Sequence, residues 1–405
     1  MANLLSILLL VTTLVTDTTS TQVYLSGDYG QSTHAIEGDR AGGFGVHAQS
    51  VYDIDSVHRV FGEASYRWHQ SHGNRFVENA DYELLAPYLT VDTVGGQKRS
   101  ETYFFRGGYR MSKRHIVWHA ALQFRAQQSY RDIDPRPKNK VADLRLDAGI
   151  GYTNSTYAWM IMGEVGRYKQ NNELKFYSEL GESQIYHMVA PGAAYTRFSG
   201  SKKESYYHGL TAGATLAMMP RRKGWLAEID YQYMRVEKEL HDNTFIPIGR
   251  LRTHALDAYL GYVMPAWRLT ASAGFTVRRG QQFIYGEAAN NTYPLLTLQS
   301  NYACSGWHIG ADGRYNCPLP FGAMLFAAGI NYSASRTSAL PVEPRWSELN
   351  RLLTDDVLNV HASIRYAFPV KGRYAWFIRP VAHFAHYTHT TCHTWHIALH
   401  TGLTF

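Results

Sequence analysis

The chain has 405 residues, a net charge of +7 and a mean hydropathy of -0.31. These values exclude a helical membrane protein, because no run beyond the N-terminal segment approaches the roughly 18 apolar residues of a spanning helix. The 29 tyrosines and 34 glycines favour strands over helices. No compact block of lysine and arginine is present, so nucleic acid is not an expected partner.

An apolar run from Leu4 to Val15 is followed by a segment rich in threonine and serine. This length suits the hydrophobic part of a secretory signal peptide, and small residues follow where cleavage is expected. We therefore predict a signal peptide over 1–21, cleaved near Ser20 or Thr21, and one barrel domain over 22–405. No lysine or arginine precedes the run, and a buried helix is the alternative.

The rest of the chain repeats one unit: two alternating runs joined by a very short turn, then a long polar stretch. Alternation with a period of two is typical of strands that face two different solvents. We expect an antiparallel up-and-down transmembrane barrel of about 16 strands, with about 14 as the alternative, and with short periplasmic turns and long extracellular loops. The expected strands cover residues 22–30, 42–52, 57–69, 101–111, 115–127, 142–152, 156–168, 206–219, 224–236, 253–263, 267–279, 302–315, 321–332, 357–368, 373–386 and 393–405.

The polar stretches between these hairpins are predicted as extracellular loops. Two of them, 69–100 and 169–205, are candidates for a loop that folds into the lumen. Both termini then lie in the periplasm. The predicted loops cover residues 69–100, 128–141, 169–205, 237–252, 280–301 and 334–356.

The strands have one apolar and one polar face. In the strand at 142–152, Leu144 and Leu146 alternate with Asp143 and Arg145. The apolar faces mostly begin or end in Trp or Tyr, as interface girdles do. Leu226 and Met234 interrupt the polar face of their strand. The polar faces predict pore-lining residues, namely Arg59, Glu63, Arg67, Arg106, Arg110, Asp143, Arg145, Asp147, Glu164, Glu228, Asp230, Asp257, Arg268, Arg278, Asp312, Arg314, His361, Arg365, Arg379, His383, His396 and His400.

These inward charges have two interpretations. They can pair across neighbouring strands and rigidify a hydrated interior. They can also form a selectivity field for a charged or sugar-like solute, and the slight excess of arginine favours anions.

Histidines gather near the C-terminus around a loop that also holds Cys392. They could bind a soft transition metal, or they could be solvated loop and lumen side chains, and we expect no metal or other cofactor. The three cysteines, Cys304, Cys317 and Cys392, predict no disulfide framework. The histidine cluster consists of His383, His386, His389, His393, His396 and His400.

Enzyme motifs are absent from the sequence: it has no G-x-S-x-G, no H-E-x-x-H and no P-loop. We therefore expect no enzyme. The alternative is a barrel-embedded hydrolase whose serine and histidine come from separate strands.

The last eleven residues, from Trp395 to Phe405, alternate like the other strands. Phe405, with Leu403, resembles the C-terminal signal that barrel-assembly machinery reads. We expect this strand to close the barrel against 22–30, because an open edge in lipid leaves backbone groups unsatisfied.

The loop segment at 130–137 (YRDIDPRP), the strand at 143–152 and Phe405 resemble Bacteroidetes outer-membrane β-barrel proteins of unassigned function. The resemblance covers most of the chain after the signal peptide. It implies a bacterial outer-membrane location, with membrane lipid and the barrel-assembly machinery as partners, and it implies no active residues.

The sequence thus predicts a channel or transporter that passes small polar or charged solutes. The absence of room for a long N-terminal plug domain disfavours an energy-coupled receptor. The alternative is a cell-surface binding or assembly component that does not conduct solutes and is closed by a partner protein.

Overall fold

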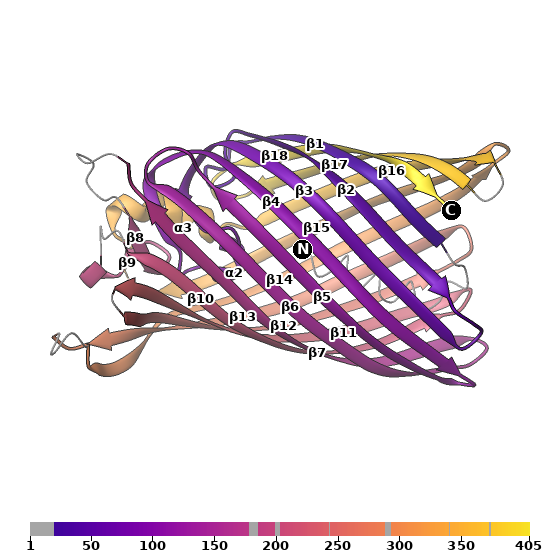
Figure 1. The fold of residues 1–405 in the computed structure, drawn as a ribbon, viewed down its shortest axis with the longest axis horizontal. Helices are drawn as coiled ribbons and strands as arrows, with labels where there is room; N and C mark the ends of the chain where they lie inside the picture. Colours follow the sequence, from indigo (N-terminus) through magenta and orange to yellow (C-terminus); the bar gives the residue numbers. More distant parts are fainter. Residues whose placement is uncertain are drawn as a thin grey trace.

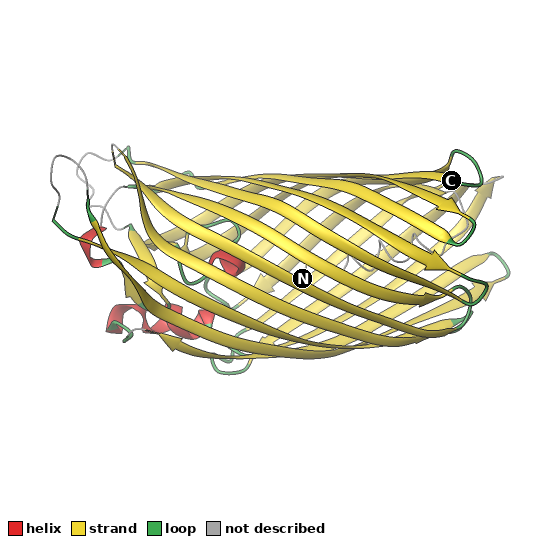
Figure 2. Cartoon of the chain, turned by 90° about the horizontal axis from the view of Figure 1, so that it is seen from below, coloured by secondary structure: helices red, strands yellow, loops and turns green. Residues whose placement is uncertain are grey.

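A closed barrel forms the fold (Figures 1 and 2). The computed structural model describes residues 20–177, 185–198, 203–242, 244–287, 293–339, 341–371 and 374–405. Sixteen antiparallel strands follow one another around the wall, and β1 (Ser20–Ser32) pairs with β18 (His393–Thr404) to close it. The predicted pairing of the last strand with 22–30 is confirmed, with Gln22 opposite Thr404. The predicted signal peptide lies almost wholly outside the described residues.

Each predicted strand corresponds to one strand of the wall. The short connections all lie at one end of the barrel, here named the short-turn end, and the other end is named the long-loop end. The remaining wall strands are β2 (Arg40–Asp53), β3 (His58–Val77), β4 (Thr90–Lys113), β5 (Ile116–Tyr130), β6 (Arg136–Thr153), β7 (Tyr157–Lys175), β10 (Glu204–Pro220), β11 (Gly224–Asp242), β12 (Thr244–Val263), β13 (Trp267–Tyr285), β14 (Leu295–Leu319), β15 (Gly322–Ala339), β16 (Val357–Lys371) and β17 (Tyr374–Tyr387).

Several strands continue far into stretches that the sequence predicts to be loops. The stretch 237–252 is mostly paired strand, from β11 into β12, and β14 reaches 25 residues. The predicted loop at 128–141 is reduced to a short connection between β5 and β6, and the predicted turn at 316–320 is shortened because β14 continues to Leu319. These loop predictions were wrong because strands that extend beyond the lipid meet water on their outer face and lose the apolar alternation.

The outer face of the barrel carries an apolar belt between two aromatic girdles. At the short-turn end Trp225 packs against Tyr262 with ring centroids 5.2 Å apart, and toward the long-loop end Phe44 stacks on Trp68 at 5.5 Å. This arrangement is that of a transmembrane barrel. Exposed aliphatic side chains of the belt include Leu146, Ile161, Val165, Leu216, Ile229, Leu260, Leu269, Ile330, Ile397 and Leu399.

Short elements lie inside the wall at the long-loop end. Two helices, α2 (Tyr82–Leu85) and α3 (Ser347–Leu353), and two strands, β8 (Tyr186–Ala190) and β9 (Ala193–Ala194), are visible there (Figures 1 and 2). Two 3-10 turns, η1 (Thr196–Phe198) and η2 (Pro344–Trp346), accompany them. Among the described residues, neither helix has the length or composition to cross a membrane.

Candidate functional site

Three chain segments fold into the mouth of the barrel at the long-loop end, and together they are named the plug: residues 78–90, 186–195 and 344–353. The first lies between β3 and β4 and contains α2, the second contains β8 and β9, and the third contains η2 and α3. The first two come from the stretches 69–100 and 169–205, which the sequence marked as candidates for inward folding. The third, from 334–356, was not marked.

Residues 78–90 cross the lumen. Counted around the closed strand order, β14 lies eight strands from β4 and is therefore diametrically opposite in the sixteen-stranded wall. The hydroxyl of Tyr88 donates to Oδ1 of Asn301 on β14 at 2.9 Å. A Cβ atom at Gly249 or Gly280 would lie 2.3 Å or 2.5 Å from Tyr88, so the two glycines make room for its ring. The segment thus spans the full width of the barrel.

Polar side chains of the wall hold this segment along its length. Arg125 on β5 binds Asp81 with two parallel hydrogen bonds of 2.6 Å and 3.0 Å, and Tyr168 donates to the same carboxylate at 2.9 Å. On the far side, Nζ of Lys238 donates to the backbone carbonyl of Leu89 at 2.6 Å, and burial holds the pKa of Lys238 well below its ordinary value. The two bonds between Arg125 and Asp81 are bidentate and charge-assisted, and such bonds are among the stronger hydrogen bonds in proteins.

A buried charge network fixes the base of the plug. Arg131, between β5 and β6, binds Glu78 at 2.7 Å and also binds Asp92. All three side chains are almost fully buried, so each charge depends on its partners. Burial raises the pKa of the Glu78 carboxyl above its ordinary value, and the neighbouring Asp92 carboxylate adds to the rise.

An apolar cluster joins the three plug segments to the wall. Leu89, Met188, Trp346 and Leu349 are buried in it, and Tyr186 packs edge-on against Trp346 at 4.9 Å. The wall contributes apolar side chains at inward positions, where a water-filled lumen would call for polar ones. These wall residues are Val141, Tyr168, Tyr207, Met234 and Val236.

The segment 186–195 forms a small sheet inside the lumen, where Thr90 is opposite His187 in the β4–β8 pairing. The His187 side chain is fully buried, and neither ring nitrogen has a hydrogen-bond partner among the described residues. Burial, helped by the nearby Lys238 charge, holds the pKa of His187 well below its ordinary value of 6.5. This imidazole is therefore neutral in the docked plug.

A cavity of about 410 Å³ lies between the plug and the wall strands β15 to β18. Its lining includes Glu83 of the plug, His34 and Glu37 of the connection between β1 and β2, and Arg278 on β13 and His396 on β18. The Arg278 guanidinium donates to the backbone carbonyl of Glu83 at 2.8 Å. The cavity is of the size that small-ligand sites have, and it adjoins the crossing segment directly.

All the predicted pore-lining residues lie on the inner face of the wall, on the side opposite the exposed belt. Several of them pair, as Arg106 does with Asp147 at 3.4 Å and Arg145 does with Asp143 at 3.1 Å. The His361 ring lies 3.1 Å from Asp312. That solutes pass these side chains stays a prediction.

The C-terminal histidines do not converge. His383 and His396 are opposite each other on β17 and β18, while His389 lies in the loop 3.3 Å from Asp356. Within the described part of the chain, no three potential metal ligands gather at one point.

One serine and one histidine meet on the inner wall. The Ser26 hydroxyl lies 3.1 Å from Nε2 of His47, and the His47 ring stacks on Tyr24 at 4.5 Å. A hydrolase needs a further group to orient the imidazole and donors for the oxyanion. No carboxylate bonds to the other His47 nitrogen among the described residues, so this pair does not define an active site.

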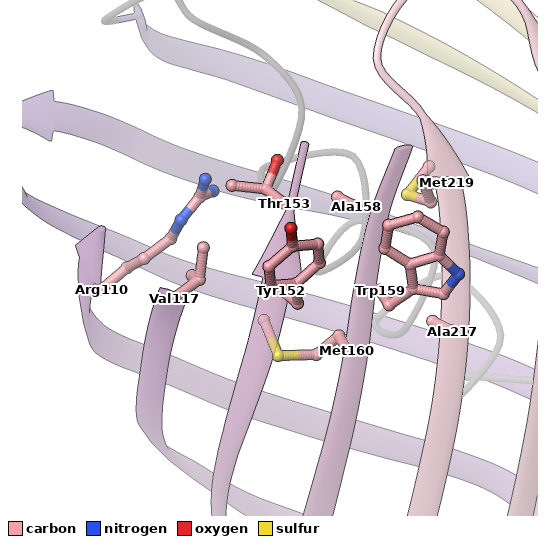
Figure 3. A pocket seen from close by; sticks show the side chains of 9 residues that line it. All are labelled: Arg110, Val117, Tyr152, Thr153, Ala158, Trp159, Met160, Ala217 and Met219. Atoms are coloured by element: carbon pink, nitrogen blue, oxygen red, sulfur yellow. The ribbon is translucent and has the colours of Figure 1, made fainter. Parts of the chain in front are cut away.

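A second, much smaller cavity lies in the wall near the short-turn end (Figure 3). Its volume is about 20 Å³, and side chains such as Val117, Tyr152, Met160 and Met219 line it. That space holds about one water molecule. It is too small for a solute.

Sequence reasoning missed the residues that hold the plug. Arg125 stands at an inward position of its predicted strand, so alternation could have identified it. Arg131, Glu78 and Lys238 fall in stretches predicted as loops, where no alternation points to them. The apolar interruption at Met234 was the available signal, because it marks wall that faces the plug.

These features define a transmembrane β-barrel whose lumen is occupied at one end by its own loops. Residues 8–349 match the model of a family of unknown function, DUF6850, and the chain belongs to that family. No curated protein matches the chain.

Solved barrels show weak similarity to this chain. A bacterial polysaccharide outer membrane secretin shares 11% identity at a TM-score of 0.40, over 95% of this chain and 97% of its own. A FadL homologue of Pseudomonas aeruginosa shares 11% sequence identity at a TM-score of 0.43, and the match covers 96% of this chain and 90% of the homologue. BauA, the ferric preacinetobactin receptor of Acinetobacter baumannii, shares 11% sequence identity at a TM-score of 0.41, and the match covers 96% of this chain and 80% of the receptor. Nothing about the activity of this chain follows from similarities of this size.

Proposed function

We propose that the protein is a gated channel or transporter of the bacterial outer membrane that passes small polar or charged solutes. In this proposal the short turns lie in the periplasm and the long loops lie outside the cell. The observation that carries the proposal is the crossing segment 78–90, which spans a lumen whose wall is charged on the inside and apolar on the outside. Such a segment can close the channel at rest and open it when it moves.

The manner of attachment supports movement of the plug. Beside the apolar cluster, residues 78–90 are held to the wall by polar contacts, such as Arg125 to Asp81 and Lys238 to the Leu89 carbonyl. When these hydrogen bonds break, water that enters the lumen can hydrate the separated polar groups. The polar part of the attachment therefore costs less to break than apolar packing of the same extent would.

The outer-membrane location is part of the same proposal. The apolar belt and the two girdles support such a location, and the resemblance at 130–137 supports a Bacteroidetes origin. We infer that Leu403 and Phe405 present the terminal strand to the barrel-assembly machinery and that lipid covers the belt. An enzymatic activity is not part of the proposal.

The second candidate is a surface binding or assembly component that never conducts. The buried network of Arg131, Glu78 and Asp92 favours it, because a permanently docked plug would be held in this way. A surface partner protein would then bind the long-loop end.

An engineered disulfide that holds the plug in place can distinguish the channel from the surface component. The hydroxyls of Thr90 in the plug and Ser205 on β10 are 2.8 Å apart, so cysteines at both positions can form a disulfide. The Thr90→Cys/Ser205→Cys variant, with Cys304, Cys317 and Cys392 changed to serine, is measured in planar bilayers. We expect conductance openings under reducing conditions and none after oxidation.

The single variant Thr90→Cys in the same background is the control, and its conductance should not respond to the redox state. If neither form of the locked protein nor the wild type conducts at any voltage, and a partner co-purifies, the surface-component function replaces the channel.

A further inference from the structure

Four arginines in one sector of the inner wall have no carboxylate partner. They are Arg268 on β13, Arg314 on β14, Arg365 on β16 and Arg379 on β17. Among the described residues none of the four forms a salt bridge, whereas inward arginines elsewhere, such as Arg145, do. They are named the arginine patch, and they lie in the half of the barrel nearer the short turns.

The strand register brings the four together. Arg268 is directly opposite Arg314 in the β13–β14 pairing. Arg365 is opposite Arg379, because the pairs Ser363–Val381 and Tyr366–Ile378 flank them.

Only β15 separates the two arginine pairs, and its inward side chains there are apolar. Ala327 stands opposite Arg314, and Leu325 stands opposite Arg365. The charges of Arg314 and Arg379 still interact across this strand. The four guanidinium groups therefore form one positive region.

Like charges directly opposite each other destabilise a sheet, and the neighbours of the patch offset this only in part. Arg365 donates to the Thr404 hydroxyl at 3.1 Å and lies over the Phe377 ring at 4.4 Å. Atom NH2 of Arg268 is buried without a hydrogen-bond partner among the described residues.

The charged groups around the patch do not neutralise it. Glu228 and Asp312 both attract the Arg268 charge, and Asp312 also contacts His361, so two carboxylates stand against four guanidinium groups. His400 is opposite Arg379 and contributes no negative charge. Several guanidinium donors thus face the lumen with no acceptor.

We propose that the arginine patch binds small anions that carry phosphate or carboxylate groups. The inference rests on the proposed channel function and narrows its solutes to anions. Planar guanidinium groups bind both kinds of oxyanion through paired hydrogen bonds. An anion bridging the two pairs also removes their mutual repulsion, which explains why a lumen wall retains four such residues in one sector.

Binding is tested with inorganic phosphate by calorimetry on the full chain in detergent. We compare the wild type with Arg314→Gln/Arg379→Gln and with the control Arg252→Gln/Arg279→Gln. The control removes the same charge from two exposed arginines on the outer face. We expect about a tenfold or greater loss of phosphate affinity in the patch variant alone.

Unfolding in urea checks the folded state of both variants. Loss of repulsion should leave the patch variant at least as stable as the wild type. Equal phosphate affinity in all three proteins, or no binding by the wild type, overturns the proposal.

Selectivity is tested separately, by reversal potentials in a potassium chloride gradient with the plug opened by Asp81→Asn. We expect a preference for chloride that falls toward parity when Arg314→Gln/Arg379→Gln is added. Phosphate binding without any conductance would reject the channel and keep the patch. Conductance without phosphate binding or chloride preference would reject the patch and keep the channel.

Discussion

Arg125 on the barrel wall and Asp81 in the plug form two parallel hydrogen bonds, of 2.6 Å and 3.0 Å, across the interior of the barrel. Both side chains are partly exposed, at 23% and 17%. The pair therefore contributes less than a fully buried one, and it joins the wall to a segment 44 residues away along the chain.

Removal of this pair should loosen the plug. In Arg125→Gln the Asp81 carboxylate loses its cation, and we expect plug docking to weaken by about 1–3 kcal/mol. Faster hydrogen exchange in residues 78–90 and a higher open probability in bilayers measure the effect. The control is Arg99→Gln, whose partner Asp132 is exposed on the loop side, and it should leave both values unchanged. Unchanged exchange in Arg125→Gln would contradict the proposed anchor.

Loss of Arg131 should be more severe. In Arg131→Met the two buried side chains Glu78 and Asp92 lose the guanidinium that bonds to both, and among the described residues only Lys98, which donates to the Val77 carbonyl, remains nearby. Breaking a buried charge network in this way costs about 3–5 kcal/mol. Limited proteolysis should then cut the 78–90 segment while the barrel stays intact. Restoration of protease resistance by Arg131→Met/Glu78→Met would assign the loss to the orphaned charge.

A methyl group at Gly249 should displace Tyr88. The added Cβ would lie 2.3 Å from the tyrosine ring, which is much closer than contact distance allows. We expect Gly249→Ala to break the Tyr88–Asn301 hydrogen bond and to cost about 1–3 kcal/mol of plug docking. Cysteine accessibility at position 88 can be measured in both backgrounds. Gly107→Ala, where nothing lies within 4 Å of the new atom, is the control and should have no effect.

Acidification should undock the plug through His187. Because its pKa is lowered in the folded state, the unfolded or undocked form binds the proton more readily. The stability that neutral His187 contributes is present above its ordinary pKa of 6.5 and is lost as the pH falls toward the lowered value. Protonation of Glu78 strengthens docking over the same range, so the measurement is made in Glu78→Gln: open probability should there rise between about pH 7 and pH 5, and adding His187→Phe should flatten the rise. A control, His389→Phe, changes a side chain that is 60% exposed, and it should keep the wild-type profile.

Alkaline conditions should loosen the plug through Glu78. Its pKa is raised, so its contribution to docking is full below the ordinary value of 4.5 and is lost as the pH rises through the folded-state pKa. Hydrogen exchange in residues 78–90 should therefore speed up on the alkaline side. Glu78→Gln keeps an oxygen acceptor for Arg131 and should remove this dependence. If the variant retains the alkaline response, another group is responsible.

The sequence by itself determined the wall. Alternation such as Leu144 and Leu146 against Asp143 and Arg145 is a local property, because successive side chains of a strand face opposite solvents. It therefore identified the strand order, the closure of β18 on β1 and the inward position of every predicted pore-lining residue. Where strands extend beyond the lipid, the outer face meets water and the inner face can pack on the plug, as Leu240 and Ile248 do, so the pattern of the wall fails at 237–252.

Only the tertiary structure decided that the lumen is crossed. Tyr88 and Asn301 are 213 residues apart, and their contact depends on two strands lying on opposite sides of a closed wall. The partners of Arg131 and Lys238 are likewise set by how a loop folds back. The traces in the sequence were the long stretches 69–100 and 169–205 and an inward Met234, whose burial against the plug explains why an apolar side chain stands on a polar face. Contacts between distant segments leave no periodic pattern in the sequence. For that reason the docked position of the plug could not be predicted from the alternation that identified the wall.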